Sequence, residues 1–81
     1  MVKQNQKEPL RDAVRDALAH YFAQLNGTAP NDLHQMVMQQ VEQPLLEVVM
    51  NHTRGNQSKA ATVLGISRST LRKKLAMYEI E

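Results

Sequence analysis

The sequence predicts an all-α fold of four helices, two long ones followed by two short ones that form a helix-turn-helix. Apolar residues recur at steps of three and four along most of the chain. Glycine and proline interrupt this pattern sparsely, and no useful stretch alternates apolar and polar residues as a half-buried strand does. At 81 residues the chain forms one small domain with a thin core, which a second copy would enlarge.

The first helix is predicted from about Pro9 to Leu25. Proline suits a first helical turn, where its missing N–H is not needed, and Asn26-Gly27 is a suitable C-terminal stop. The apolar residues of this helix follow one face: Leu10, Val14, Leu18, Tyr21, Phe22 and Leu25.

The second helix is predicted from about residue 32 to residue 51, with Asn31 or Asp32 as its N-cap. Pro44 lies inside it, and because the apolar pattern resumes in phase beyond the proline, we expect a bend rather than an end. Its predicted apolar stripe is Leu33, Met36, Val37, Val41, Leu45, Val48 and Val49. The two short helices are too small to cover both long stripes, so we expect a homodimer rather than a self-covered monomer.

The short helices are predicted from residue 56 to 64 and from residue 67 to about 78, with Asn56 and Ser67 as N-caps. Gly65 supplies the left-handed residue that ends the first of them. Four apolar residues complete the pattern. Two small ones lie where the helices cross, one fills the corner between the helices, and one anchors the second helix on the first: Ala60, Ala61, Ile66 and Leu71. This spacing is typical of a helix-turn-helix, which presents its second helix to the major groove of DNA.

The net charge of +2 is unevenly distributed. Residues 1–51 carry four basic and six acidic side chains, a net charge of −2, whereas residues 52–81 carry six basic and two acidic ones, a net charge of +4. A polyanionic partner is therefore expected for the C-terminal third only.

The polar face of the last helix suits insertion into a DNA groove. Ser69, Thr70 and Lys73 point away from its apolar stripe, with cations on both flanks. Arg68 in the first turn is the candidate for a guanine contact, because arginine pairs with guanine through two hydrogen bonds. A solvated basic helix end is the alternative interpretation for the lysines. The first turn of the preceding helix is also expected to face phosphate.

The chain resembles the bacterial factor for inversion stimulation (Fis) family from about residue 9 to residue 78. Four stretches carry the resemblance: AHYFAQLNG (19–27), VEQPLLEVVM (41–50), TRGNQSKAA (53–61) and LGISRSTLRKKL (64–75). The last stretch is shared with the DNA-binding tails of NtrC-type activators, so the first two are the ones that single out Fis.

The resemblance implies an intertwined homodimer whose four-helix core is built from the first two helices of each subunit, with a bend at Pro44. It implies a nucleoid-associated transcription regulator in the bacterial cytoplasm, which bends double-stranded DNA and reads minor-groove width. The expected parts are a disordered tail (1–8), dimerisation helices (9–52) and the helix-turn-helix (53–81). Contact with RNA polymerase stays open. The implied DNA-contacting residues are Arg54 as a flank contact, Asn56, Ser58, Lys59, Arg68, Thr70, Arg72, Lys73 and Lys74.

The chain departs from the enteric form of the family in three places. Only MVKQNQKE precedes Pro9, which is too short for the β-hairpin arm that stimulates the DNA invertase, so we expect no such stimulation. Ala76 and Met77 replace lysines, which predicts weaker wrapping of flanking DNA. Ser67 replaces an asparagine, which puts a contact there in question.

The sequence indicates no enzyme, cofactor, metal site or membrane partner. It has no cysteine, its three histidines have no ligand spacing, and no apolar run approaches the ~20 residues of a membrane span. Two other hypotheses stay open. One is the DNA-binding tail of an NtrC-type activator, and the other is a helical dimer that tethers a protein partner.

Overall fold

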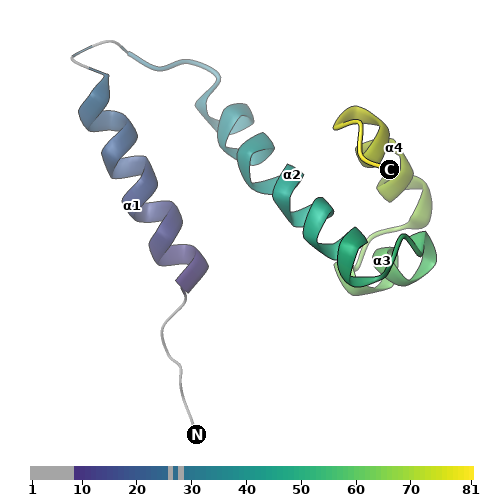
Figure 1. Cartoon of the computed structure of the whole chain (residues 1–81). Helices are drawn as coiled ribbons and strands as arrows, with labels where there is room; N and C mark the ends of the chain where they lie inside the picture. Colours follow the sequence, from purple (N-terminus) through teal and green to yellow (C-terminus); the bar gives the residue numbers. More distant parts are fainter. Residues whose placement is uncertain (1–8, 26, 28) are drawn as a thin grey trace, which may run out of the picture. The chain divides into compact units, whose positions relative to one another are not determined.

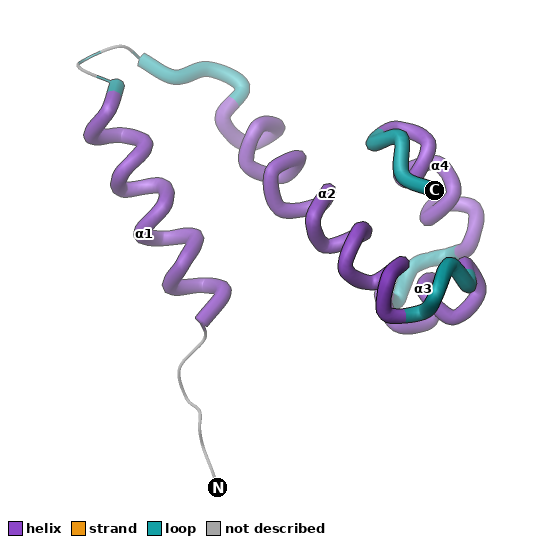
Figure 2. The backbone as a smooth tube through the Cα atoms, viewed as in Figure 1, coloured by secondary structure: helices purple, strands orange, loops and turns teal. Residues whose placement is uncertain are grey.

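The computed structural model describes residues 9–25, 27 and 29–81, and within them it contains four α-helices and no strand (Figures 1 and 2). The predicted all-α fold and the order of its helices are confirmed. The expectations for residues 1–8, a disordered tail and no hairpin arm, lie outside the described residues. The helices are α1 (Pro9–Gln24), α2 (Leu33–His52), α3 (Gln57–Leu64) and α4 (Arg68–Met77).

The chain divides into two compact units, residues 1–31 and residues 32–81. The first unit contains α1, which begins at the predicted proline and has no buried residue. Leu10 and Phe22 on this helix are 69% and 49% exposed. An isolated helix of this length is only marginally stable in water, so α1, taken by itself, depends on packing of its apolar face.

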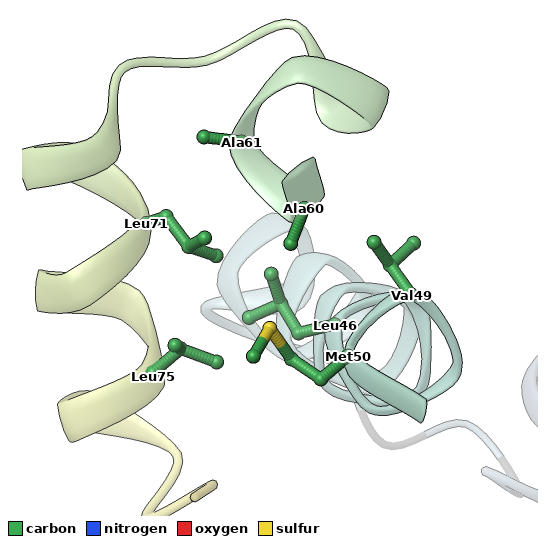
Figure 3. Packing of buried hydrophobic residues seen from close by; sticks show 7 residues of the cluster. All are labelled: Leu46, Val49, Met50, Ala60, Ala61, Leu71 and Leu75. Atoms are coloured by element: carbon green, nitrogen blue, oxygen red, sulfur yellow. The ribbon is translucent and has the colours of Figure 1, made fainter. Parts of the chain in front are cut away.

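The second unit contains the other three helices and holds the core (Figure 3). Leu46 on α2 and Leu71 on α4 are the two largest fully buried side chains. The two buried residues of α3 are alanines, whose methyl groups leave little material between neighbouring helices. The core consists of Leu46, Val49, Met50, Ala60, Ala61, Leu71 and Leu75, with Leu64, Ile66, Tyr78 and Ile80 packed against it.

The signals that delimit α3 and α4 are confirmed. The Asn56 side chain accepts a hydrogen bond from the Lys59 N–H at 3.0 Å, and the Ser67 side chain accepts one from the Thr70 N–H at 3.1 Å. Gly65 ends α3 with a φ of 76°, and its N–H donates to the Ala61 carbonyl at 2.8 Å. These local contacts satisfy backbone groups that the helix ends would otherwise leave without partners.

The predicted N-cap position of α2 is confirmed, but the expected capping bond is not made. Asp32 occupies the N-cap position, but its side chain makes no capping hydrogen bond. Its φ of 52° and ψ of 29° are left-handed, whereas a capping side chain needs an extended backbone to reach the N–H groups of the first turn. Farther along, α2 is one continuous helix across Pro44, as predicted, while the bend itself stays a prediction.

The apolar residues of α2 form two faces rather than one stripe. Leu46, Val49 and Met50 are buried beneath α3 and α4, while Leu45 and Val48 are 47% and 67% exposed. The predicted stripe joined Leu45 and Val48 to Val49 and left out Leu46 and Met50, which was wrong. The reason is that two surfaces share this helix, so its apolar pattern is wider than one face.

Among the described residues, no helix combines the length and the apolar character that crossing a membrane requires.

Candidate nucleic-acid interface

The exposed face of α4 is positioned by the buried face on the opposite side of the helix. Leu71 and Leu75 are buried against α2 and α3, and Tyr78 is half-buried at the end of the helix. Leu71 is 0% exposed, so this side of the helix stays against the core. The predicted contact residues on the other side of α4 are all exposed: Arg68, Thr70, Arg72 and Lys73.

The hydroxyl groups at the start of α4 form a local cluster. Besides capping the helix, the Ser67 hydroxyl donates to Thr70 Oγ1 at 2.8 Å, and Ser67 Oγ lies 3.2 Å from Ser69 Oγ. Ser67 is therefore committed to holding the first turn together. Arg68 follows directly, on a turn whose backbone these contacts fix.

The start of α3 carries a second set of predicted contacts. Asn56, Ser58 and Lys59 are exposed in the first turn, where free backbone N–H groups attract anions. The cap uses only the side-chain oxygen of Asn56, so its amide nitrogen is not committed to this bond.

An open hollow of about 640 Å³ lies at the junction of α2 and α3. It brings together three of the predicted residues, Arg54, Ser58 and Lys59, with His52 beside them. Arg54 and Gly55 both have positive φ, 56° and 80°, which turns the chain sharply between the two helices. The residues that line the hollow are His52, Thr53, Arg54, Ser58, Lys59, Thr62 and Val63.

His52 is one of the histidines in which the sequence shows no ligand spacing. Its place in the hollow follows from the turn after α2, which no spacing of histidines would have indicated.

Lys74 differs from the other predicted contacts because it faces α2. Its Nζ atom lies 2.8 Å from Glu42 Oε2, and the two side chains are only 30% and 28% exposed. The Tyr78 hydroxyl donates to the other oxygen of the same carboxylate, Glu42 Oε1, at 2.7 Å. We call Glu42, Lys74 and Tyr78 the Glu42 clamp.

The clamp changes the ionisation of its members. Two hydrogen bonds hold the pKa of Glu42 below its usual value of 4.5. The bond from Lys74 has the larger effect, and the bond from Tyr78 has the next largest. The hydrogen bond to Glu42 raises the pKa of Tyr78 above its usual value of 10.0. Both shifts favour the observed pairing of a carboxylate with two donors.

Sequence reasoning missed Glu42. It lies 32 residues before Lys74 along the chain, and it faces α4 because Leu46, one turn farther along α2, is buried. Since the predicted stripe of α2 omitted Leu46, the direction of Glu42 did not follow from the pattern. The position of Lys74 beside Leu75 and one turn before Tyr78 is the signal that could have pointed to a contact of this kind.

The remaining cations are available to a polyanion. Within residues 9–25, 27 and 29–81 the ion pairs are Arg15–Asp12 and Lys74–Glu42, so five exposed cations of the second unit pair with no carboxylate. These cations are Arg54, Lys59, Arg68, Arg72 and Lys73. In the same part of the chain, no three His, Asp or Glu side chains gather as metal ligands would.

Comparison with known proteins gives two family matches. The family described as "Bacterial regulatory protein, Fis family" matches residues 37–78, and the one described as "DNA-binding protein Fis N-terminal domain" matches residues 2–30. Similar relatives include proteins named DNA-binding protein Fis from Escherichia coli O1:K1 / APEC and from Klebsiella pneumoniae subsp. pneumoniae. Each is 60% identical over 72 residues, which cover 89% of this chain and 74% of the relative.

Proposed function

The chain belongs to the Fis family of bacterial regulatory proteins, and from this premise we propose that it is a homodimeric, DNA-bending, nucleoid-associated transcription regulator. The observation that carries the proposal is α4, a helix anchored by Leu71 and Leu75 whose exposed face presents Arg68, Arg72 and Lys73. A rigid helix with unpaired cations around short polar side chains is the form that enters a major groove.

The individual contacts divide into base reading and phosphate binding. Arg68 in the first turn of α4 reads a guanine, because its guanidinium matches O6 and N7 of that base. Arg72 and Lys73 meet phosphates beside the groove, and the start of α3 with Asn56 and Lys59 meets a phosphate from its side. Arg54, in the hollow between α2 and α3, contacts the DNA flank.

The homodimer is supported by the apolar surface that each of the two units, taken by itself, leaves uncovered. Met38, Leu45 and Val48 lie at steps of seven and three along α2, with 46%, 47% and 67% of each residue exposed. A stripe with this spacing is the one that packs on another helix. Since α1 also has no buried residue, a second copy would cover the apolar surface of both long helices. Residues 9–52 then dimerise, and residues 53–81 bind DNA.

Bending of the DNA follows from the family resemblance rather than from one chain alone. Two reading helices that stand closer together than one turn of straight DNA can both enter the major groove only if the duplex bends. A bent duplex is also read at bases that the protein never touches, since the free energy needed to deform DNA depends on its sequence.

A gel shift with an A/T-centred duplex, run beside sedimentation of the free protein, tests this proposal. We expect a dimer that binds the duplex, with log K falling against log salt at a slope of about −9 if about ten phosphates are contacted. The matched control is the double variant Arg68→Ala/Lys73→Ala. It removes two cations of the proposed DNA-binding face and leaves the core intact, because both side chains are exposed. A single subunit in solution, or no binding even in dilute buffer, would contradict the proposal.

The family match over residues 2–30 favours a Fis protein over the tail of an NtrC-type activator. The helical dimer that tethers a protein partner makes a different prediction, namely no salt-sensitive binding to DNA, and the same gel shift separates it.

A further inference from the structure

Glu42 joins α2 to α4 by two polar contacts at one carboxylate. Lys74 Nζ meets Oε2 at 2.8 Å and the Tyr78 hydroxyl meets Oε1 at 2.7 Å, so each oxygen has its own partner. These are contacts between elements that the turn and α3 separate in sequence, and both lie within the second compact unit.

We propose that Glu42 is a positioning residue for DNA recognition, which fixes the rotation of α4 on α2 through Lys74 and Tyr78. Lys74 then acts through this contact rather than on a DNA phosphate. The inference rests on the proposed DNA-binding function and deepens it, because it assigns a role to a residue that touches no DNA.

The geometry of α4 explains why such a clamp is needed. Leu71 and Leu75 hold the helix against α2 and α3 by apolar contact, which is not directional and permits small rotations. Lys74 and Tyr78 lie four residues apart, so they stand one above the other on the same face. Two hydrogen bonds from adjacent turns to one carboxylate oppose rotation of α4 about its axis, which would swing Arg68 and Lys73 together.

The same geometry explains why Lys74 differs from its neighbour Lys73. Lys73 is exposed and pairs with no described carboxylate, whereas the Lys74 side chain is 30% exposed and already has a partner. Moving the Lys74 ammonium to a phosphate would leave Glu42, 28% exposed, without its cation. Removing the cation from a partly buried carboxylate costs more free energy than removing it from a fully solvated carboxylate, because less water is available to replace the cation.

The clamp also links recognition to the proposed dimer. Glu42 projects from α2 toward α4, and Leu45 and Val48 of the same helix lie on a face that the second unit, taken by itself, leaves uncovered and that a second copy would meet. Breaking the clamp should therefore make the distance between the two α4 helices of the dimer less well defined. Affinity for the preferred DNA site should fall more than affinity for a random duplex, because random DNA is bound through charge alone.

The test measures affinity for an A/T-centred Fis-type site and for a random duplex across a salt series, using the full-length protein. The clamp variants are Tyr78→Phe, Glu42→Gln and Lys74→Gln, and Lys73→Gln is the matched control for charge. We expect each clamp variant to lower the ratio of specific to random affinity about three- to tenfold. Tyr78→Phe does so without changing charge, and it removes a single oxygen atom.

The salt dependence separates positioning from phosphate binding at Lys74. Lys73→Gln should flatten the slope of log K against log salt by about 0.9 for each phosphate that the variant no longer neutralises, whereas Lys74→Gln should leave the slope near that of the natural protein. The double variant Glu42→Gln/Lys74→Gln should be no worse than the Lys74→Gln variant, because both changes break the same interaction.

Three results would overturn the inference. A slope flattened by Lys74→Gln as much as by Lys73→Gln would mean that Lys74 binds a phosphate. Tighter binding of both duplexes by Glu42→Gln would mean that Glu42 only competes for Lys74. An unchanged affinity ratio in Tyr78→Phe, which stays informative if the charge variants fold poorly, would remove the clamp. A natural protein that binds neither duplex would instead refute the proposed function.

Discussion

The Tyr78 hydroxyl, just after α4, donates a 2.7 Å hydrogen bond to Oε1 of Glu42 on α2. The other oxygen of that carboxylate holds the ammonium of Lys74. The reading helix is therefore tied to the long helix by polar contacts at the edge of the apolar core, and this arrangement has a measurable signature in the pH dependence of stability.

Acid should destabilise the protein partly through Glu42. Its pKa is lowered in the folded state relative to the usual value of 4.5, so its contribution is fully present above about pH 4.5 and is lost as the pH falls through the lower folded value. We expect Glu42→Gln to lose less unfolding free energy than the natural protein between about pH 6 and about pH 3. Urea unfolding at fixed protein concentration measures the free energy of unfolding of the variant and of the natural protein. Equal losses in the two proteins would contradict the role of Glu42.

Replacing Asn56 separates its role as a cap from its role in DNA binding. Asn56→Ala removes the acceptor for the Lys59 N–H and should lower the free energy of unfolding by about 0.5–2 kcal/mol. Asn56→Asp keeps that acceptor, so stability should be retained, while the added negative charge should weaken DNA binding. Chemical denaturation and a gel shift of the same two variants check this pair, and equal stability of the alanine variant would speak against the cap.

Leu71 should be the most sensitive position of the helix-turn-helix core. It is 0% exposed beside Ala60 and Leu46, so Leu71→Ala should leave a cavity and lower the free energy of unfolding by about 2–5 kcal/mol. Val63 on α3 is 59% exposed, and Val63→Ala should change it by less than about 0.5 kcal/mol. Thermal unfolding followed by circular dichroism compares the two, and similar midpoints would mean that Leu71 is not an anchor.

Arg68 and Lys73 should differ in what their removal does to sequence preference. Arg68→Ala should cost about 1–3 kcal/mol on the preferred site and flatten the preference, because the side chain that pairs with a base is removed. Lys73→Ala should weaken binding to all sequences alike, because a cation that meets a phosphate is removed. Competition binding with mutated sites measures both effects. A uniform loss of affinity across sequences for Arg68→Ala would remove its role in reading the bases.

The sequence predicted most accurately the features that depend on neighbouring residues. The caps at Asn56 and Ser67 and the turn at Gly65 depend on contacts within four residues, so their residue types are sufficient to identify them. The exposure of Arg68, Thr70, Arg72 and Lys73 followed from one buried stripe on a short helix.

The features that sequence reasoning missed depend on distant residues. Leu46 and Leu45 are adjacent and both apolar, yet one is buried under α4 and the other is exposed, and only the packing of α3 and α4 decides which. The same packing brings Glu42 to Lys74. Asp32 failed as a side-chain cap because its backbone is left-handed, a conformation that its residue type permits but does not require.

Two copies of the chain are expected to hold their α4 helices on one duplex and to bend it. Gel electrophoresis of equally long DNA fragments, in which the binding site is placed at different distances from the ends, tests this claim most directly. We expect the protein–DNA complex to migrate most slowly when the site is central and fastest when it is near an end. Migration that does not depend on the position of the site would contradict the account.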